Sequence, residues 1–293
     1  MQVEGVRACS LFVRKVIIME YSVLMSVYYK ENPKWFDVSI QSMLNQTIKT
    51  NDFVLVEDGP LTSELEKVVN KYQKMYPKIF NVIRLEKNQG LGPALAIGVE
   101  ACKNEWIARM DSDDYSVPDR IEKQLNIIKE NPEIDMIGSS IAEFIDNIEN
   151  VQAYRLLPSS HKEIVKFSKK RNPFGHPSML IKKSKVMEAG NFRSYHLVED
   201  YDMWIRMIEH GAITYNISEV LVYMRIGKDF YRRRGGIKYL RSILKFKKEQ
   251  YHKGYFSPRD YLISSGSSVF VCLIPNCIRE FIYKKILRKG DFK

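Results

Sequence analysis

Between residues 21 and 110, short apolar runs alternate with longer segments whose apolar residues recur at helical spacing. The runs have the length of buried strands, and the longer segments predict helices between them. Repeated strand–helix units imply a parallel, doubly wound sheet, in which ligands bind beyond the carboxyl ends of the strands. Strands are expected over residues 21–27, 53–56, 79–85, 106–110, 136–144 and 179–181, and helices over residues 35–45 and 63–75, from the glycine-rich turn at 88–92 to 103, from Pro118, and from 199.

The strand expected at residues 106–110 ends at three carboxylates, Asp111, Asp113 and Asp114. Like charges this close repel one another, so a folded chain keeps them together when they are solvated or neutralised. Their oxygen atoms suit Mg²⁺ or Mn²⁺, which bind through one or two carboxylates and complete their shell with water and substrate phosphates. The alternative is an acidic turn in front of a helix.

Neither of two common phosphate-binding loops is present in the sequence. No Gly-x-Gly-x-x-Gly follows the first expected strand, and no Gly-x-x-x-x-Gly-Lys-Ser/Thr occurs. A diphosphate would therefore have to be held through a metal, which the acidic strand end offers.

Charge is distributed unevenly along the chain. The 293 residues are 45% hydrophobic and 28% charged, which is typical of a folded protein with a large core. Residues 225–293 contain 18 Lys and Arg against 5 Asp and Glu, a net charge of +13, which leaves −2 of the total of +11 for residues 1–224. The basic tail interleaves apolar residues at helical spacing and favours an anionic membrane surface over nucleic acid as partner. The alternative is a helical cap with a solvated basic face.

Five motifs in order, between about residues 21 and 223, resemble family 2 inverting glycosyltransferases of the GT-A fold. The resemblance implies an α/β fold with a Rossmann-like, mostly parallel sheet flanked by helices, followed by a C-terminal helical appendage. Each motif is weak alone, but their order is specific for the family, although not for the sugar. The motifs are Ser22–Tyr28, Ser39–Thr47, Val56–Gly59, Asn88–Gly92 and Arg109–Asp114.

The resemblance also implies which residues bind the donor. Asp58 would accept a hydrogen bond from the base ring, which favours uracil. Asp111 and Asp113 would form the Asp-x-Asp motif that reaches the ribose and the metal, Mn²⁺ or Mg²⁺, with Asp114 as an additional or alternative ligand. The expected substrate-binding residues are Ser26, Val27, Tyr28, Glu31, Asp58, Gly90, Asp111 and His176.

A second acidic pair, Glu199 and Asp200, opens an expected helix, where acids are ordinary capping residues. Inverting sugar transfer needs a carboxylate that takes a proton from the acceptor hydroxyl. The resemblance implies that Asp200 is this base and that Glu199 positions the acceptor, whereas Asp202 points elsewhere and is structural. His176, between Gly and Pro at a strand entrance, is a candidate for substrate or diphosphate contact, or else it satisfies local backbone. Arg120 is either a structural partner for the acids or a contact to the donor, and the structural role is favoured.

Similar bacterial members build O-antigen or capsule repeat units on undecaprenyl diphosphate. The resemblance therefore implies a UDP-sugar donor, with galactose or glucose favoured, and β-linkage to a lipid-diphosphate-linked N-acetylhexosamine; GlcNAc, GalNAc or rhamnose transfer are alternatives. A nucleotidyltransferase is a rival, but it would carry a glycine-rich loop after its first strand. A non-catalytic membrane- or nucleic-acid-binding protein would leave the acidic strand ends unexplained, and we expect no nucleic-acid partner.

The cysteines and the apolar runs indicate where the protein works. The four cysteines form neither a zinc spacing nor a disulfide framework, which indicates a reducing cytoplasm. No convincing signal peptide and no run of about 18 apolar residues is present. We expect a cytoplasmic enzyme, peripheral on the inner face of the membrane.

The sequence divides into three segments. Residues 1–20 are a leader, either disordered or an upstream-start artefact before Met19. Residues 21–224 are a catalytic domain, with a nucleotide-sugar half to about 115 and an acceptor half from about 116, and residues 225–293 are the tail.

Overall fold

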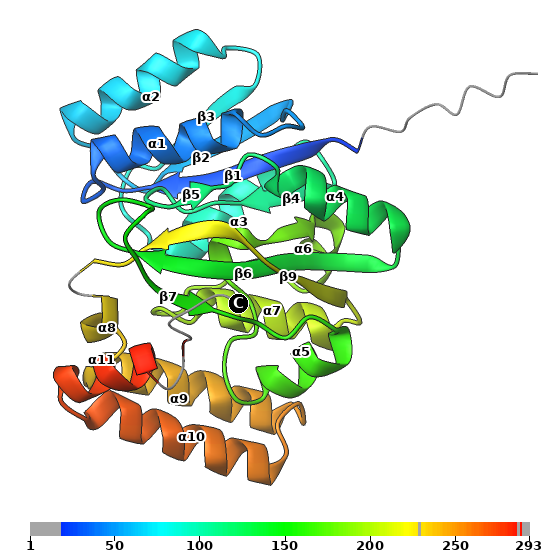
Figure 1. The fold of residues 1–293 in the computed structure, drawn as a ribbon, viewed down its shortest axis with the longest axis vertical. Coiled ribbons are helices and arrows are strands. Elements are labelled where there is room, and N and C mark those ends of the chain that lie inside the picture. The colour runs from blue at the N-terminus through cyan, green and yellow to red at the C-terminus, as the bar shows by residue number, and fades with distance from the viewer. Residues whose placement is uncertain (1–18, 228–229, 286–287, 289–293) are drawn as a thin grey trace, which may run out of the picture.

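The strands of the described chain form one nine-stranded sheet in the order β3-β2-β1-β4-β8-β6-β9-β5, with β7 paired to β6 (Figure 1). The computed structural model describes residues 19–227, 230–285 and 288, so the expected leader lies almost wholly outside it. The strands are β1 (Tyr21–Val27), β2 (Asp52–Glu57), β3 (Phe80–Arg84), β4 (Trp106–Arg109), β5 (Tyr115–Ser116), β6 (Ile134–Phe144), β7 (Val151–Arg155), β8 (Leu180–Lys182) and β9 (Ile213–Arg225). The helices are α1 (Pro33–Leu44), α2 (Ser63–Met75), α3 (Leu91–Ala101), α4 (Arg120–Glu130), α5 (His161–Ser168), α6 (Lys183–Glu188), α7 (Glu199–Glu209), α8 (Phe230–Arg233), α9 (Gly236–His252), α10 (Pro258–Leu273) and α11 (Asn276–Lys285).

The half of the sheet that carries the acidic strand ends is parallel, as predicted. β1 lies between β2 and β4, β2 also pairs with β3, and all three pairings are parallel. Beyond β4 the sheet is mixed, because β8 runs antiparallel to both β4 and β6, whereas β6 and β9 are parallel. The predicted α/β sheet flanked by helices and followed by C-terminal helices is confirmed.

The sheet separates two hydrophobic cores. Val23 and Met25 of β1 lie in the core formed with α1, α2 and α4, whereas Leu24 lies in the core formed with α3 and α7. Successive side chains of a strand point to opposite faces, so a strand buried on both sides reads as a continuous apolar run. This explains why β1 was recognisable from its sequence alone.

Two buried polar side chains fix the loops around the β4 end. Gln46, after α1, donates from Nε2 to the Val117 carbonyl (2.8 Å) and accepts from the Ile121 amide (3.1 Å). Arg120 is fully buried and donates to the carbonyls of Arg109 (3.0 Å) and Met179 (3.1 Å). The structural role expected for Arg120 is confirmed, and it ties the start of α4 to β4.

The tail is helical and packs on the catalytic domain through its inner side. In α9, Phe246 is fully buried, and its ring centroid lies 4.6 Å from that of Tyr201 in α7. α10 packs against α9 and lies at the outer edge of the molecule (Figure 1). Across residues 19–227 and 230–285, no helix is both long and apolar enough to span a bilayer.

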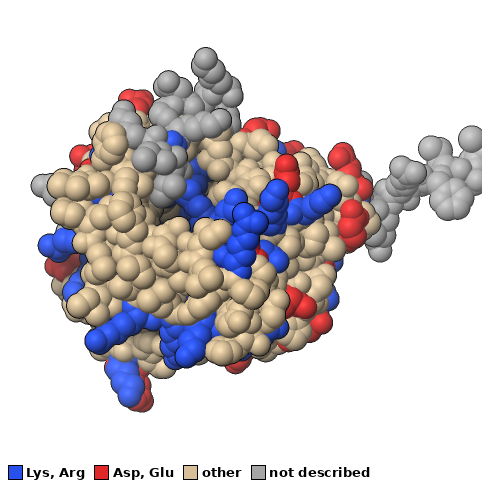
Figure 2. Space-filling model, turned by 90° about the horizontal axis from the view of Figure 1, so that it is seen from below, with Lys and Arg blue, Asp and Glu red and all other residues tan. Residues whose placement is uncertain are grey.

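The outer side of α10 is apolar and uncharged. Residues 261–278 contain no Asp, Glu, Lys or Arg, and Leu262, Phe270 and Leu273 are 69%, 60% and 61% exposed. Seen from this side, a broad uncharged surface is bordered by Lys and Arg (Figure 2). The tail therefore buries one face against the domain and leaves the other to solvent.

Candidate active site

The acidic motifs meet at one edge of the sheet because β1, β2 and β4 are parallel and end there. Ser26 and Val27 end β1, and Tyr28 follows as an exposed side chain. The Val27 carbonyl accepts from the amide of Asp58 (2.8 Å), which joins the loops after β1 and β2. The donor-binding residues expected at the ends of β1, β2 and β4 thus lie at a common edge.

Glu31 connects the loop after β1 to the loop after β4. Its Oε2 accepts from Ser112 Oγ (2.6 Å) and its Oε1 from the Asn32 amide (2.8 Å). Ser39, on α1, donates to the Asp111 carbonyl (2.6 Å) from the other side. Burial raises the pKa of Glu31. These contacts hold the acidic loop at a fixed distance from the expected nucleotide pocket.

The three acids after β4 have different surroundings. Burial disfavours the Asp111 anion, but the Arg109 guanidinium, which is ion-paired with it, holds the pKa of Asp111 below its usual value. Burial and the nearby charges of Glu31 and Asp111 raise the pKa of Asp113 to about 7. Burial, with Asp113, raises the pKa of Asp114 well above its usual value. The carboxylates therefore repel one another, as the sequence predicted.

Arg225, the last residue of β9, braces this loop. Its amide donates to Asp114 Oδ1 (2.7 Å), and its Nε donates to the Asp113 carbonyl (3.1 Å). Its guanidinium carbon lies 4.4 Å from the ring centroids of both Trp35 and Phe144. The other oxygen of Asp114, Oδ2, is buried with no hydrogen-bond partner in the described chain.

The acidic loop fits a divalent cation in its chemistry. Asp111 and Asp113 offer hard oxygen donors of the kind that a divalent cation prefers. A positive charge would reduce the repulsion between these carboxylates and would give the unpartnered Asp114 oxygen a favourable interaction. No group of three or more His, Cys, Asp or Glu side chains within the described ranges is already arranged around one metal position.

Asp58 organises the glycine-rich turn. Its two carboxylate oxygens accept from the amides of Gln89 (2.7 Å) and Gly90 (3.0 Å), and its carbonyl accepts from Asn88 Nδ2 (3.0 Å). Gly90 has φ +92° with open space where a side chain would stand, so a larger residue would be strained by its backbone. The turn is thereby fixed beside the end of β2.

Arg109 links His176 to the acidic loop. This fully buried guanidinium donates from Nε to His176 Nε2 (3.1 Å) and pairs with Asp111 through Nη2. Burial, followed by the Arg109 charge, lowers the pKa of His176 to about 4. The imidazole is therefore neutral near pH 7, and because Nε2 accepts, Nδ1 carries the proton. His176 can donate a hydrogen bond from Nδ1 but is not a base.

The second acidic pair begins α7. Asp200 is partly exposed; its Oδ2 accepts from Asn172 Nδ2 (2.6 Å) and its Oδ1 from the Tyr201 amide (2.7 Å). Glu199 is buried, and its Oε2 has no hydrogen-bond partner among the residues that are described. Burial, with the Asp200 charge, raises the pKa of Glu199 to about 7.

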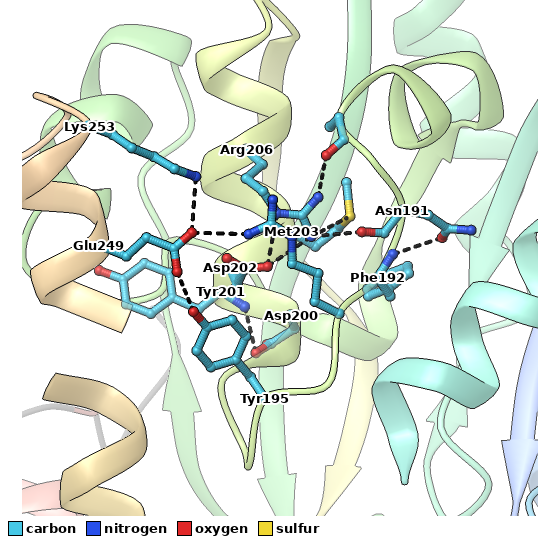
Figure 3. Close-up of polar contacts among 12 residues, drawn as sticks. Asn191, Phe192, Tyr195, Asp200, Tyr201, Asp202, Met203, Arg206, Glu249 and Lys253 are labelled. Atoms are coloured by element: carbon cyan, nitrogen blue, oxygen red, sulfur yellow. Dashed lines mark hydrogen bonds and ion pairs between the residues drawn. The ribbon is translucent and has the colours of Figure 1, made fainter. Parts of the chain in front are cut away.

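Hydrogen bonds and ion pairs hold the rest of α7 in place, as the close-up in Figure 3 shows. Asp202 is fully buried and accepts from Arg206 Nε (2.9 Å), while Arg206 Nη2 donates to the Asn191 carbonyl (2.7 Å). Glu249 of α9 accepts from the Tyr195 hydroxyl in the loop before α7. The structural role expected for Asp202 is confirmed, and Asp200 stands on a fixed helix.

His176 lies near both acidic regions. The charges of Asp111 and Asp200 both act on its imidazole, and Asp111 also acts on Glu199. The sequence prediction missed Arg109, Asn172 and Arg225. A basic residue inside an apolar strand run was a signal for Arg109, because a buried charge needs partners. Nothing in the sequence distinguished Asn172 or Arg225, whose partners are distant along the chain.

A mixed sheet whose parallel strands end in acids, with a second acidic pair at the start of α7, is typical of a glycosyltransferase of the GT-A class. The chain belongs to glycosyl transferase family 2, whose sequence profile matches residues 22–189. The family and the fold class predicted from the five motifs are confirmed, and the protein is a glycosyltransferase.

Three known proteins illustrate the similarity. The UDP-Gal:alpha-D-GlcNAc-diphosphoundecaprenol beta-1,3-galactosyltransferase of Escherichia coli is 36% identical over 270 residues, which cover 92% of this chain and 97% of that one. The amylovoran biosynthesis glycosyltransferase of Erwinia amylovora is 33% identical over 273 residues, 92% of this chain and 100% of that one. A mannosyltransferase of Pyrobaculum calidifontis, solved with GDP-Man and Mn²⁺, shares the fold, with a TM-score of 0.64 at 13% identity over 87% of this chain and 70% of that one.

Proposed function

We propose that this enzyme transfers galactose or glucose from a UDP-sugar, with inversion, to an N-acetylhexosamine carried on undecaprenyl diphosphate during O-antigen or capsule synthesis. The observation that carries the proposal is the similarity to the E. coli galactosyltransferase across nearly the full length of both chains, tail included. Transfer of GlcNAc, GalNAc or rhamnose in the same pathway class is the alternative.

On the donor side, we assign the nucleotide to the region between the ends of β1 and β2 and the glycine-rich turn. Asp58 has lone pairs left for the uracil ring beyond its two backbone contacts. Ser26, Val27, Tyr28, Glu31 and Gly90 are the remaining assigned lining residues.

Asp111 and Asp113 are the proposed ligands of Mn²⁺ or Mg²⁺, with Asp114 as the additional or alternative ligand. When bound, the cation stabilises the charge that develops on the departing diphosphate. The mutual repulsion of these carboxylates supports the assignment, because a cation removes it. His176, neutral and with its proton on Nδ1, is positioned to donate a hydrogen bond to a sugar or phosphate oxygen.

On the acceptor side, we assign Asp200 as the base that takes the proton from the attacking hydroxyl. Hydrogen bonds from Asn172 and the Tyr201 amide fix its carboxylate, and its partial exposure leaves it accessible. Glu199, buried beside it with an unpartnered oxygen, is assigned to position the acceptor. Single displacement with one base gives the inverted, β-linked product.

We also propose that the enzyme works in the cytoplasm, bound peripherally to the inner face of the membrane through its tail. The support is the apolar outer side of α10 with its Lys and Arg border (Figure 2). Such a surface suits the boundary of an anionic leaflet, where a lipid-linked acceptor resides.

The test of the function is a transfer assay on a synthetic N-acetylglucosamine-diphosphate-lipid acceptor. UDP-, GDP- and dTDP-sugars are supplied in turn, with Mn²⁺ or with a chelator. We expect turnover of one UDP-hexose that stops with the chelator, and a β-anomeric product by NMR. Absence of UDP binding would contradict the donor site, and turnover in chelator would remove the metal from the proposal.

A further inference from the structure

Three arginines outside the donor site lie close enough to act on one another, and one of them, Arg155, is linked to Asp200 through Asn172. They are Arg155 at the end of β7, Arg171 after α5, and Arg288 near the C-terminus, so they come from segments far apart in the sequence. The charges of Arg288 and Arg171 act on Arg155, Arg288 also acts on Arg171, and Asp200 is among the charges that act on Arg155. The fold therefore brings three cations together, with Arg155 nearest to the base.

Among the residues that the structure describes, two carboxylates, those of Glu143 and Asp200, accompany the three guanidinium groups of the cluster. Arg288 pairs with the fully buried Glu143 (2.7 Å), and Glu143 and Asp200 are the acids that act on Arg155. Arg155 donates from Nη2 to the Asn172 carbonyl (2.8 Å), while its Nε is buried with no hydrogen-bond partner among described residues. The Arg171 guanidinium lies 5.5 Å from the Phe167 ring centroid and forms no ion pair within the described chain.

Burying these cations together is unfavourable unless an anion joins them. Burial, and then repulsion from Arg288 and Arg171, lowers the pKa of Arg155 to about 9. Burial, and then Arg288, also lowers the pKa of Arg171. A guanidinium is suited to bidentate contact with phosphate oxygens, and an anion at this position would satisfy the free Nε.

We propose that Arg155, Arg171 and Arg288 form the subsite for the diphosphate of the lipid-linked acceptor. The inference rests on the proposed function, in which the acceptor sugar carries its diphosphate one ring away from the hydroxyl that Asp200 deprotonates. Asn172 joins the two places in the chain, because it contacts Arg155 through its carbonyl and Asp200 through its side chain. The donor diphosphate is assigned to the β4 end, so the two diphosphates occupy separate places.

Arg171→Gln is the cleanest test because the Arg171 side chain contacts the Phe167 ring and holds no part of the base. Kinetics are compared for two acceptors, an α-GlcNAc diphosphate ester and a methyl α-GlcNAc glycoside that lacks phosphate. We expect the KM for the diphosphate ester to rise ~10- to 100-fold, with the methyl glycoside and the KM for the UDP-sugar unchanged. Lys129→Gln, which removes one charge at the opposite edge of the sheet, should change none of these values.

Binding of farnesyl diphosphate without donor separates this inference from the function itself. If the wild type uses neither acceptor, the proposed function fails. Weaker binding of farnesyl diphosphate by Arg171→Gln than by the wild type would still support the subsite in that case. Equal binding by variant and wild type overturns it, as does an equal rise in KM for both acceptors or a raised KM for the UDP-sugar. Arg155→Gln is the second variant; it should also lower kcat, because Arg155 supports Asn172. Unchanged binding to anionic vesicles excludes a lipid headgroup as the anion.

Discussion

Glu199 and Asp200 are adjacent in the sequence but lie in opposite environments. Asp200 is partly exposed and held by two hydrogen bonds, whereas Glu199 is buried with one oxygen unpartnered. Two carboxyl groups placed in such different surroundings can take different roles in one site. This contrast is the residue-scale basis for assigning one as base and the other as a positioning group.

Changing Asp200 to Asn keeps the size of the side chain but removes its basicity and leaves one accepting oxygen in place of two. We expect kcat to fall ~10²- to 10⁴-fold, while UDP binding, measured by calorimetry, stays as in the wild type. Asp202→Asn is the control, since it breaks the buried pair with Arg206 and should lower stability by about 3–5 kcal/mol instead. Normal turnover by Asp200→Asn would remove Asp200 from the base role.

Glu199 makes stability depend on pH. Its pKa of about 7 in the folded state lies above the ordinary 4.5, so the folded state binds more protons between these values, and the free energy of unfolding falls as pH rises from about 4.5 to about 7. Glu199→Gln cannot ionise and should therefore be more stable than the wild type at pH 8, by about 3 kcal/mol, with no gain at pH 4. Denaturant unfolding at both pH values measures this. An equal effect of the substitution on stability at both pH values would mean that folding does not raise the pKa of Glu199.

Site residues were predictable where local sequence carries the signal. Asp111, Asp113 and Asp58 follow apolar runs, and this position indicates the end of a strand, although it did not indicate that Asp58 is buried there. Arg225 and Asn172 were not predictable, because each acts through partners that only the folded chain brings near. Long-range hydrogen bonds leave no periodicity in a sequence.

At the scale of elements, α7 serves two purposes. Its first turn carries the acidic pair, and the side opposite the sheet packs on α9 through Tyr201 and Ile205. The position of the tail and the position of the base are thus coupled through one helix.

Phe246→Ala should show this coupling as a loss of stability. Removing a fully buried ring leaves a cavity between α9 and α7, which should lower the free energy of unfolding by about 3–5 kcal/mol. Ile237→Ala, on the exposed side of α9, should change it by less than about 0.5 kcal/mol. Chemical denaturation measures both variants. A small loss for Phe246→Ala would indicate an appendage that folds apart from the domain.

The elements were predictable in proportion to their length and burial. β1 to β4 and the helices between them were expected nearly at their observed bounds, and α4 begins two residues after Pro118. The placing of β8 between β4 and β6 was not predictable. It is three residues long, and its antiparallel pairing is decided by neighbours from distant parts of the chain.

At the scale of the whole molecule, charge and apolar surface concentrate on the tail side. The double variant Leu262→Ser, Phe270→Ser should weaken binding to vesicles containing phosphatidylglycerol ~10²- to 10⁴-fold, because moving each of the two exposed apolar side chains out of water stabilises the bound state by about 1.5–3 kcal/mol. Co-sedimentation measures the partitioning. Turnover of a water-soluble acceptor should be unaffected. Met75→Ser, an exposed apolar residue on α2, is the control, and equal loss in both variants would reject the tail as the membrane contact.

Asn172 contacts both the arginine cluster and the proposed base. Its carbonyl accepts a hydrogen bond from Arg155, and its side-chain amide donates one to Asp200. A single residue therefore joins the group assigned to bind the acceptor phosphates to the group assigned to take the acceptor's proton. Both hydrogen bonds are formed in the chain without an acceptor, so the carboxylate is already oriented before any substrate binds. The enzyme then has no base to rearrange after the acceptor arrives, and less of the binding free energy is lost in ordering side chains.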